Sequence, residues 1–96
     1  MSTGHLIVIS EFCTAHQIEI TFVESLAQQG LITTEIVNEQ LAIQDTQLPS
    51  LEKMVRLHYD LDINLEGIET IFHLLERVEA LQHEMHELRK KMGLYE

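Results

Sequence analysis

The chain has 96 residues, a net charge of −10 at pH 7, a hydrophobic content of 45% and one cysteine, Cys13. This length fits one small globular region, and a lone cysteine excludes an internal disulfide. The sequence predicts neither a signal peptide nor a membrane span, because it has no basic N-terminal region and no run of about 18 apolar residues. We therefore expect a cytoplasmic protein.

The charges are unevenly distributed along the chain. All six Lys and Arg residues lie after residue 52, whereas residues 1–52 contain only acidic charges. An anionic surface repels phosphate backbones and lipid headgroups and attracts basic protein faces. The simpler alternative is that the acidic residues only keep the protein in solution.

The first predicted elements are a strand and a short helix. Residues 5–9 form a β-branched run that is typical of a strand. Ser10 is then expected to cap a helix that ends near His16, with Phe12 and Cys13 facing the core.

A second helix is predicted over residues 19–29, after a tight turn at Gln17 and Ile18. Its apolar residues follow a spacing of three and four, and Gly30 is expected to end it in a left-handed conformation. Two helices of this size joined by a short turn form a helix-turn-helix unit. The apolar side of the second helix consists of Ile18, Phe22, Val23 and Leu26.

A β-hairpin, or wing, is predicted next. Two extended segments, residues 33–37 and 40–44, flank Asn38 and Glu39. Leu41 and Ile43 are expected on one face, and the N-terminal strand can join the same sheet.

A third helix should start at Leu48 and Pro49, since proline is favoured in the first turn. We expect the chain to turn at Asp62 and Ile63, and Asn64 to cap the last helix. The apolar stripe of the third helix is predicted to contain Leu51, Met54, Val55, His58 and Leu61.

The C-terminal helix carries a coiled-coil pattern. Its apolar residues alternate steps of three and four, which defines a seam of a and d positions that needs a partner. We expect Ile68, Phe72 and Leu75 to pack on the chain itself and a second copy to cover the rest. Residues 1–66 are thus predicted to be a winged helix-turn-helix domain and residues 67–96 an association helix. The predicted dimerisation residues are Ile71, Leu74, Val78, Leu81, Met85, Leu88 and Met92, with Tyr95 as the next position.

This order of elements resembles the MerR-type winged helix-turn-helix proteins. The segments that carry the resemblance are residues 9–12, 30–32, 56–61 and 64–68. Within that superfamily the chain is most similar to the short, acidic chaperone-modulator proteins of the CbpM type, which are bacterial. The similarity covers about residues 5–94, and it implies a mainly α fold with a small β wing and a dimerising coil.

The chain departs from the DNA-binding relatives at their recognition helix. Near residues 21 and 24, where those relatives place arginine, this chain has Thr21 and Glu24, and its wing lacks arginine. Binding a duplex requires cations that neutralise several phosphates, and base reading mostly uses Arg, Lys, Asn and Gln. We therefore expect no nucleic-acid binding. A DNA-binding transcription regulator or DNA-associated accessory factor is the alternative.

The resemblance to chaperone modulators implies a protein partner. Such proteins bind the J-domain of a DnaJ-like co-chaperone and inhibit its stimulation of the Hsp70 partner. J-domains carry a basic helix, to which an acidic surface is complementary. The predicted partner-binding residues are Glu19, Ile20, Glu24 and Glu39, and the acids of the third helix, Glu52 and Asp60, are the alternative docking face.

Flanking charges leave the orientation of the coil open. Glu84 and Arg89 can pair between parallel helices, whereas MerR-type relatives pair antiparallel, and we expect the antiparallel arrangement from the resemblance.

Chemistry at a catalytic or metal site is not expected. His83 and His86 lie near Glu79 and Glu87 on the long helix, but they occupy the outer face and have no closed set of ligands. Cys13 is expected to be a small buried side chain, even though His16 lies one turn away. The sequence therefore predicts no enzyme, no cofactor and no metal.

Overall fold

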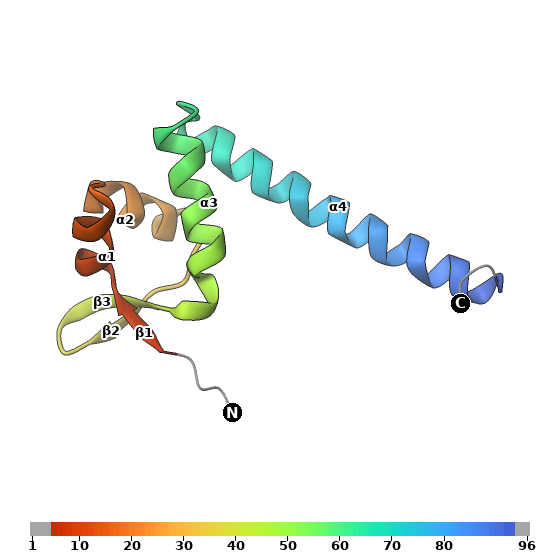
Figure 1. The fold of residues 1–96 in the computed structure, drawn as a ribbon, viewed down its shortest axis with the longest axis horizontal. Coiled ribbons are helices and arrows are strands. Elements are labelled where there is room, and N and C mark those ends of the chain that lie inside the picture. Colours follow the sequence, from red (N-terminus) through yellow and green to blue (C-terminus); the bar gives the residue numbers. More distant parts are fainter. Residues whose placement is uncertain (1–4, 94–96) are drawn as a thin grey trace. The chain divides into compact units, whose positions relative to one another are not determined.

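The computed structural model describes residues 5–93. Within them the chain is mainly helical, with a small antiparallel sheet and a long C-terminal helix (Figure 1). The predicted fold class is confirmed. The elements are β1 (Leu6–Val8), α1 (Ile9–His16), α2 (Ile20–Gln28), β2 (Glu35–Val37), β3 (Gln40–Gln44), the 3-10 turn η1 (Asp45–Gln47), α3 (Leu48–Tyr59) and α4 (Leu65–Lys91).

The chain divides into two compact units. The residues up to 65 form the N-terminal unit, and those from 66 on belong to α4 and its end. The division lies beside the boundary expected between residues 66 and 67. That the two parts are separate functional domains stays a prediction.

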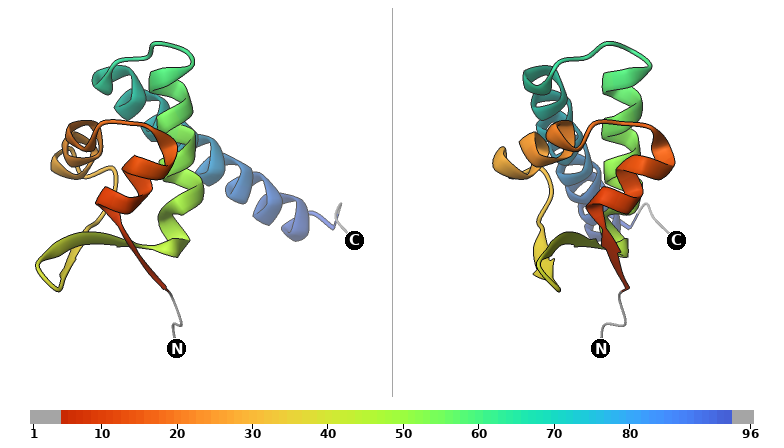
Figure 2. Two further views of the ribbon diagram at one scale, coloured as in Figure 1. Left: turned by 60° about the vertical axis from the view of Figure 1, so that its left-hand side comes forward. Right: turned by 90° about the vertical axis from the view of Figure 1, so that its left-hand side faces the viewer.

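The N-terminal unit places α1, α2 and α3 on one side of a three-stranded sheet (Figure 2). The strand order is β1-β3-β2, and both pairings are antiparallel. The N-terminal strand therefore joins the sheet, as predicted. Ala42 and Ile43 on the central strand are fully buried, whereas Leu41, which was expected on the same face as Ile43, is half-buried.

The core of this unit contains most of the predicted inward positions. Phe12 and Cys13 are buried in α1, and the middle of α2 contributes two side chains with no exposed surface. The buried side chains are Ile9, Phe12, Cys13, Phe22, Val23, Leu26, Ile32, Ala42, Ile43, Leu51 and Met54.

The start of α1 differs from the prediction. Val8 is the N-cap, Ile9 is the first helical residue instead of the last strand residue, and Ser10 lies exposed in the first turn with no capping role. Ile9 is 1% exposed. Burying such a side chain contributes about 1.5–3 kcal/mol, which outweighs the roughly 1 kcal/mol of a serine cap.

Two left-handed residues end the helices of the helix-turn-helix unit. Gln17 follows α1 with φ 58°, and the Ile18 N–H donates to the Cys13 carbonyl over 3.0 Å. Gly30 ends α2 with φ 78°, and the Leu31 N–H donates to the Leu26 carbonyl over 3.0 Å. Both ends are Schellman motifs. The predicted turn at Gln17 and the stop at Gly30 are confirmed.

The wing turns at the predicted pair. Asn38 and Glu39 have φ 51° and 65°, the two positive values that a type I′ hairpin turn requires. However, β2 starts at Glu35 and not at residue 33. The Gln47 side chain accepts a hydrogen bond from the Thr33 N–H over 2.8 Å and donates to the Thr33 carbonyl over 2.7 Å. The backbone groups of Thr33 are therefore bonded to the Gln47 amide and not to a neighbouring strand.

The third helix starts at Leu48 with Pro49 in its first turn, as predicted. Leu51 and Met54 are buried, and Val55 and His58 are half-buried. The prediction for Leu61 was wrong, because α3 ends at Tyr59 and Leu61 is 63% exposed. The helical period places a side chain on the apolar stripe only while the helix continues.

The chain then turns and enters α4. Asp62 has φ 58°, which confirms the predicted turn. α4 begins at Leu65, directly after Asn64, and ends at Lys91. Met92 therefore lies just beyond the helix, with its N–H donating to the Leu88 carbonyl over 3.0 Å. Tyr95 lies outside the described residues.

The two left-handed helix ends predict opposite effects of a pair of substitutions. Gln17→Gly should raise the free energy of unfolding by up to about 1 kcal/mol, because glycine adopts positive φ without the steric cost of a Cβ. Gly30→Ala should lower it by about 1 kcal/mol. A Cβ at Gly30 meets no atom within 4 Å, so the cost would come from the backbone alone.

Urea unfolding at one fixed protein concentration measures both changes. An unchanged midpoint for Gln17→Gly would contradict the assignment of conformational strain to this turn.

Candidate functional site

The start of α2 presents three of the four predicted partner-binding residues together. Glu19 is the N-cap of α2, Ile20 is 38% exposed, and Glu24 is exposed one helical turn further on. The Thr21 hydroxyl lies 3.5 Å from a Glu19 carboxylate oxygen and can donate to it. This side of α2 therefore combines an exposed aliphatic side chain with two carboxylates.

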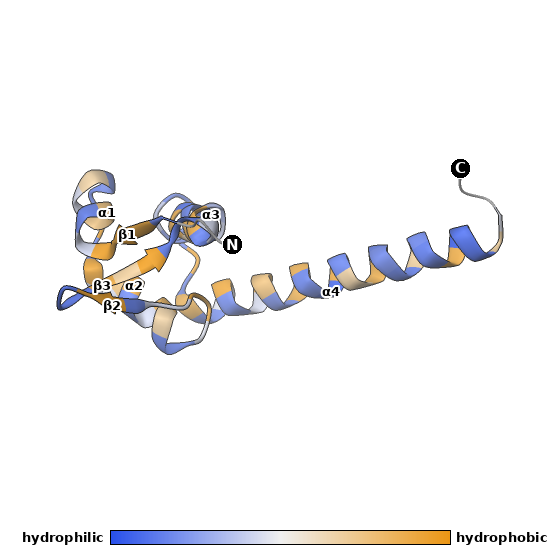
Figure 3. Ribbon diagram, turned by 90° about the horizontal axis from the view of Figure 1, so that it is seen from below, coloured by the Kyte–Doolittle hydropathy of each residue, from blue (hydrophilic) through white to orange (hydrophobic). Residues whose placement is uncertain are grey.

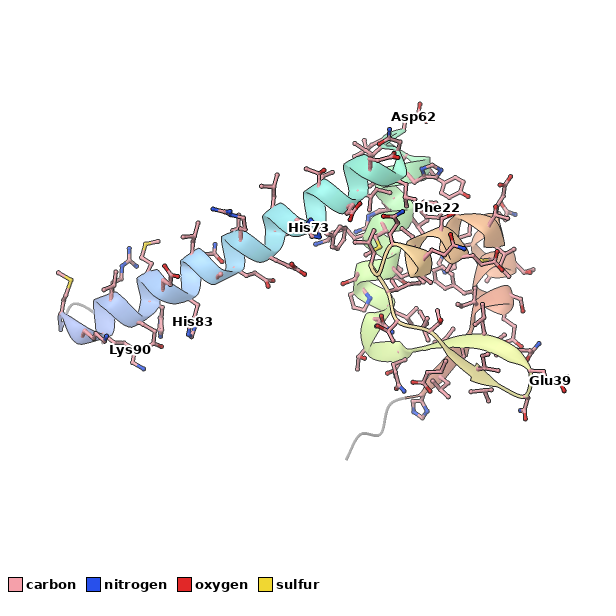
Figure 4. All side chains as sticks on the ribbon, turned by 180° about the vertical axis from the view of Figure 1, so that it is seen from behind. Phe22, Glu39, Asp62, His73, His83 and Lys90 are labelled. Carbon is pink, nitrogen blue, oxygen red and sulfur yellow. The ribbon has the colours of Figure 1, made fainter. Side chains whose placement is uncertain are left out.

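The fourth residue, Glu39, is not part of this cluster. It lies in the turn of the wing, at the opposite end of the N-terminal unit from Asp62 and well away from Phe22 of α2 (Figure 4). Partner contacts at Glu39 would require a ligand that also reaches the wing.

The end of α3 adjoins the start of α2. The Glu19 N–H donates to the Tyr59 hydroxyl oxygen over 3.1 Å. The Phe22 ring stacks on His58, with ring centroids 4.3 Å apart, and meets Tyr59 edge-on at 5.6 Å. These three rings hold the two helices together at their exposed ends.

Tyr59 and Leu61 are exposed residues that the sequence analysis did not select for this surface. Tyr59 is 41% exposed, and Leu61 follows it two positions later. The available signal was the run of Tyr59, Asp60 and Leu61 at the end of a helix. It could have been recognised only if the end of α3 had been placed at Tyr59.

The charges around this surface are mostly negative. α1, α2 and the wing carry no Lys or Arg, and the first basic residues in the chain, Lys53 and Arg56, lie on α3. No counterion-releasing cation is therefore available on α2 or the wing.

Cys13 has the character of a core residue. Burial and the charge of Glu24 both raise the pKa of the Cys13 thiol, and burial has the larger effect. The His16 ring lies against Phe12, with ring centroids 4.2 Å apart. The surroundings of Cys13 thus disfavour the thiolate that a nucleophile needs.

The apolar seam of α4 is exposed within this single chain. Ile71 is half-buried, while the later seam side chains have 46–67% of their surface exposed. Figure 3 shows apolar residues recurring along the helix between hydrophilic ones. These exposed positions are Leu74, Val78, Leu81, Met85, Leu88 and Met92.

The outer face of α4 carries the histidines. His83 Nε2 lies 4.0 Å from a Glu87 carboxylate oxygen, and 74% of the His83 and 46% of the Glu87 side-chain surface is exposed. Among residues 5–93, no group of three or more His, Cys, Asp or Glu side chains is arranged to hold a metal ion. Within the same range, no helix is long and apolar enough to cross a membrane.

Comparison with known proteins identifies a family over most of the chain. A family model described as MerR HTH family regulatory protein matches residues 7–90. No curated protein and no solved structure matches the chain.

The raised pKa of Cys13 predicts slow alkylation. At pH 8.5 the folded protein should react with iodoacetamide more slowly than the same protein in urea, because less thiolate is present and the sulfur is buried. Glu24→Gln removes the charge that raises the pKa, so it should speed the reaction. Mass spectrometry of the alkylated fraction over time measures both rates. Slower alkylation of the Glu24→Gln variant would contradict the conclusion that the Glu24 charge raises the pKa of Cys13.

Proposed function

Since the chain belongs to the MerR helix-turn-helix family of regulatory proteins, we propose that it regulates a protein partner and not a promoter. Specifically, it acts as a chaperone modulator: it binds the J-domain of a DnaJ-like co-chaperone and inhibits that domain's stimulation of its Hsp70 partner. It works as an acidic homodimer without nucleic acid or cofactor.

The observation that carries this proposal is the charge of the helix-turn-helix face. α2, the helix that would enter the major groove in a DNA-binding relative, exposes Glu19 and Glu24, and the wing tip exposes Glu39. Carboxylates at these positions would meet phosphates with like charge, and they are complementary to a basic helix. The MerR family scaffold is thus combined with an α2 and a wing that carry no Lys or Arg, which supports a protein ligand over a duplex.

The resemblance to the chaperone modulators supplies the partner. It is carried by Glu11, Phe12 and Cys13 of α1, by residues 56–61 at the end of α3, and by the entry to α4. Phe12 and Cys13 form core, and residues 59–61 lie exposed beside the acidic start of α2.

A second copy of this chain is the proposed partner of the α4 seam. Six large apolar side chains spaced three and four apart are too regular and too exposed for a solvated helix face. The helix begins with Glu66 in its first turn and ends with Arg89, Lys90 and Lys91 in its last. Antiparallel pairing would place the basic end of one helix beside the acidic start of the other.

The flanking charges select one antiparallel register. If Val78 packs against the partner's Leu81, Arg77 lies beside the partner's Glu84, and by symmetry Glu84 lies beside the partner's Arg77. A shift by one heptad in one direction would oppose Arg77 to Lys91 and Glu84 to its own copy, and a shift in the other direction would oppose Arg77 to its own copy. The first register is therefore the one that the charges favour, since opposite charges at these positions stabilise a coil and like charges destabilise it.

Binding to the J-domain should depend on the acids of α2. Glu19→Lys combined with Glu24→Lys should weaken binding about tenfold or more, whereas Glu76→Lys with Glu79→Lys on the outer side of α4 should change it little. Added salt should slow association more than it speeds dissociation, because complementary charges mainly raise the association rate. Surface plasmon resonance with a purified J-domain measures both rate constants.

Two outcomes would overturn the functional proposal. The first is no binding of any J-domain tested, together with unchanged stimulation of the Hsp70 ATPase. The second is binding of duplex DNA at physiological salt in the range of about 10⁻⁴ to 10⁻⁶ M or tighter, which is typical of ordinary DNA-binding proteins. The second outcome would favour the transcription regulator.

The seam predicts a dimer that a single charge disrupts. Leu81→Lys places an ammonium group in the centre of the apolar layer, at a cost on the order of several kcal/mol, so the dimer should dissociate. Ala80→Lys adds the same charge on the outer side of α4 and should leave the dimer intact. Light scattering after size exclusion measures the mass, and a dimeric Leu81→Lys variant would place the interface elsewhere.

Charge reversal then tests the orientation of the dimer. Glu84→Lys should weaken an antiparallel dimer by about 1 kcal/mol, the sum of two exposed ion pairs. Adding Arg77→Glu should restore its stability, while adding Arg89→Glu should not. Rescue by Arg89→Glu and not by Arg77→Glu would show that the helices run parallel.

A further inference from the structure

We propose that the centre of the partner-binding site is a surface shared by the start of α2 and the end of α3, and that it takes a basic amphipathic helix. We call it the α2–α3 surface. It consists of Glu19, Ile20, Tyr59, Asp60, Leu61 and Asp62. The inference rests on the proposed function in that the natural partner is a basic protein. It joins Glu19 and Ile20 with Asp60, which the sequence analysis had assigned to alternative faces, and adds Tyr59, Leu61 and Asp62.

The apolar part of this surface comes from the start of α2, the end of α3 and the loop after α3. Ile20, Tyr59 and Leu61 are 38%, 41% and 63% exposed. The Glu19 N–H to Tyr59 hydroxyl contact of 3.1 Å brings the Tyr59 side chain to the first residues of α2. Exposed tyrosine and branched aliphatic side chains at a helix junction can be desolvated by a partner, and tyrosine is enriched among the residues that dominate binding energies.

The rim of the α2–α3 surface is acidic. Glu19 flanks Ile20, and Asp60 and Asp62 lie on either side of Leu61, all three with exposed side chains. The nearest cation in the sequence is Arg56, one helical turn before Asp60 on α3. A partner whose leucines fill the apolar centre would therefore place lysines or arginines against the rim and away from Arg56.

The loop that carries Leu61 is held in place before any partner binds. The Ile63 N–H donates to the Leu57 carbonyl over 3.0 Å, and His58 Nδ1 donates to the Ile63 carbonyl over 2.9 Å. Asp62 takes the left-handed conformation between these two bonds. A surface fixed in this way loses little conformational freedom when a ligand docks.

The wing tip offers the competing location and also the matched control. Ile36 is 74% exposed and shares the wing with Glu35 and Glu39. It is a single side chain on a three-residue edge strand, without a neighbouring exposed aromatic ring. Isolated exposed aliphatic residues are normal on protein surfaces. The wing tip therefore lacks the wider apolar area that a helix would cover.

The test uses a fluorescein-labelled synthetic peptide of about 18 residues, with leucines at i, i+3, i+4 and i+7 and lysines elsewhere. Fluorescence anisotropy measures its binding to the full-length protein. Leu61→Ser should weaken binding about fivefold or more, and Asp60→Lys should do the same. Arg56→Glu should tighten it about threefold. Ile36→Ser should leave the dissociation constant unchanged.

The gain expected for Arg56→Glu separates the proposal from simple damage to the fold, because a misfolded variant does not bind more tightly. All four positions are exposed, and circular dichroism of each variant checks that the helix content is retained. Failure of the wild-type protein to bind the peptide, or sensitivity to Ile36→Ser without sensitivity to Leu61→Ser, would overturn the α2–α3 surface.

The same variants distinguish this inference from the functional proposal. If a J-domain binds but Leu61→Ser has no effect on it, the function stands and the location is wrong. If the peptide binds through Leu61 and no J-domain binds, the surface is a site for basic helices and the chaperone role is wrong.

Discussion

The contact between the second and third helices is the constraint on which the proposed surface depends. Phe22 is buried between α2 and α3, its ring stacks on His58, and its edge contact with Tyr59 directs the tyrosine hydroxyl to the Glu19 N–H. The first N–H groups of a helix have no partner within the helix. A tyrosine hydroxyl supplies the acceptor that a capping side chain would otherwise provide at α2. The position of α2 is therefore fixed by tertiary contacts and not by a local cap.

Local signals in the sequence predicted the ends of elements wherever backbone conformation alone decides them. Gly30 and Pro49 are found at a left-handed helix end and in a first helical turn, and Asn38 with Glu39 forms the hairpin turn. Ser10 and Leu61 were misplaced because long-range packing decides their surroundings. The core needs Ile9 in a helical position, and α3 ends at Tyr59, before the chain reaches Leu61.

The candidate site could be predicted only in part for the same reason. The net charge of a segment is the sum of the charges of its residues, so the acidic character of α2 and the wing could be predicted from the sequence. Which residues lie close together in the folded chain cannot be obtained by such a sum. The contact of Glu19 with Tyr59 and the separation of Glu39 from Phe22 follow from how α2, α3 and the wing are arranged, which spacing alone does not give (Figure 4). In family terms, a helix-turn-helix scaffold of the MerR type is combined with an α2 and a wing that carry no Lys or Arg.

The Gln47 side chain closes the base of the wing hairpin. Because the Gln47 amide pairs with both backbone groups of Thr33, the hairpin is tied at its base, while Asn38 and Glu39 at its tip are exposed. Substitutions at the tip can then accumulate without disturbing the core. In a winged protein built in this way, substitutions during evolution can change what the wing binds while the fold is kept. The same closed base would make the hairpin a suitable place for grafting a foreign recognition loop.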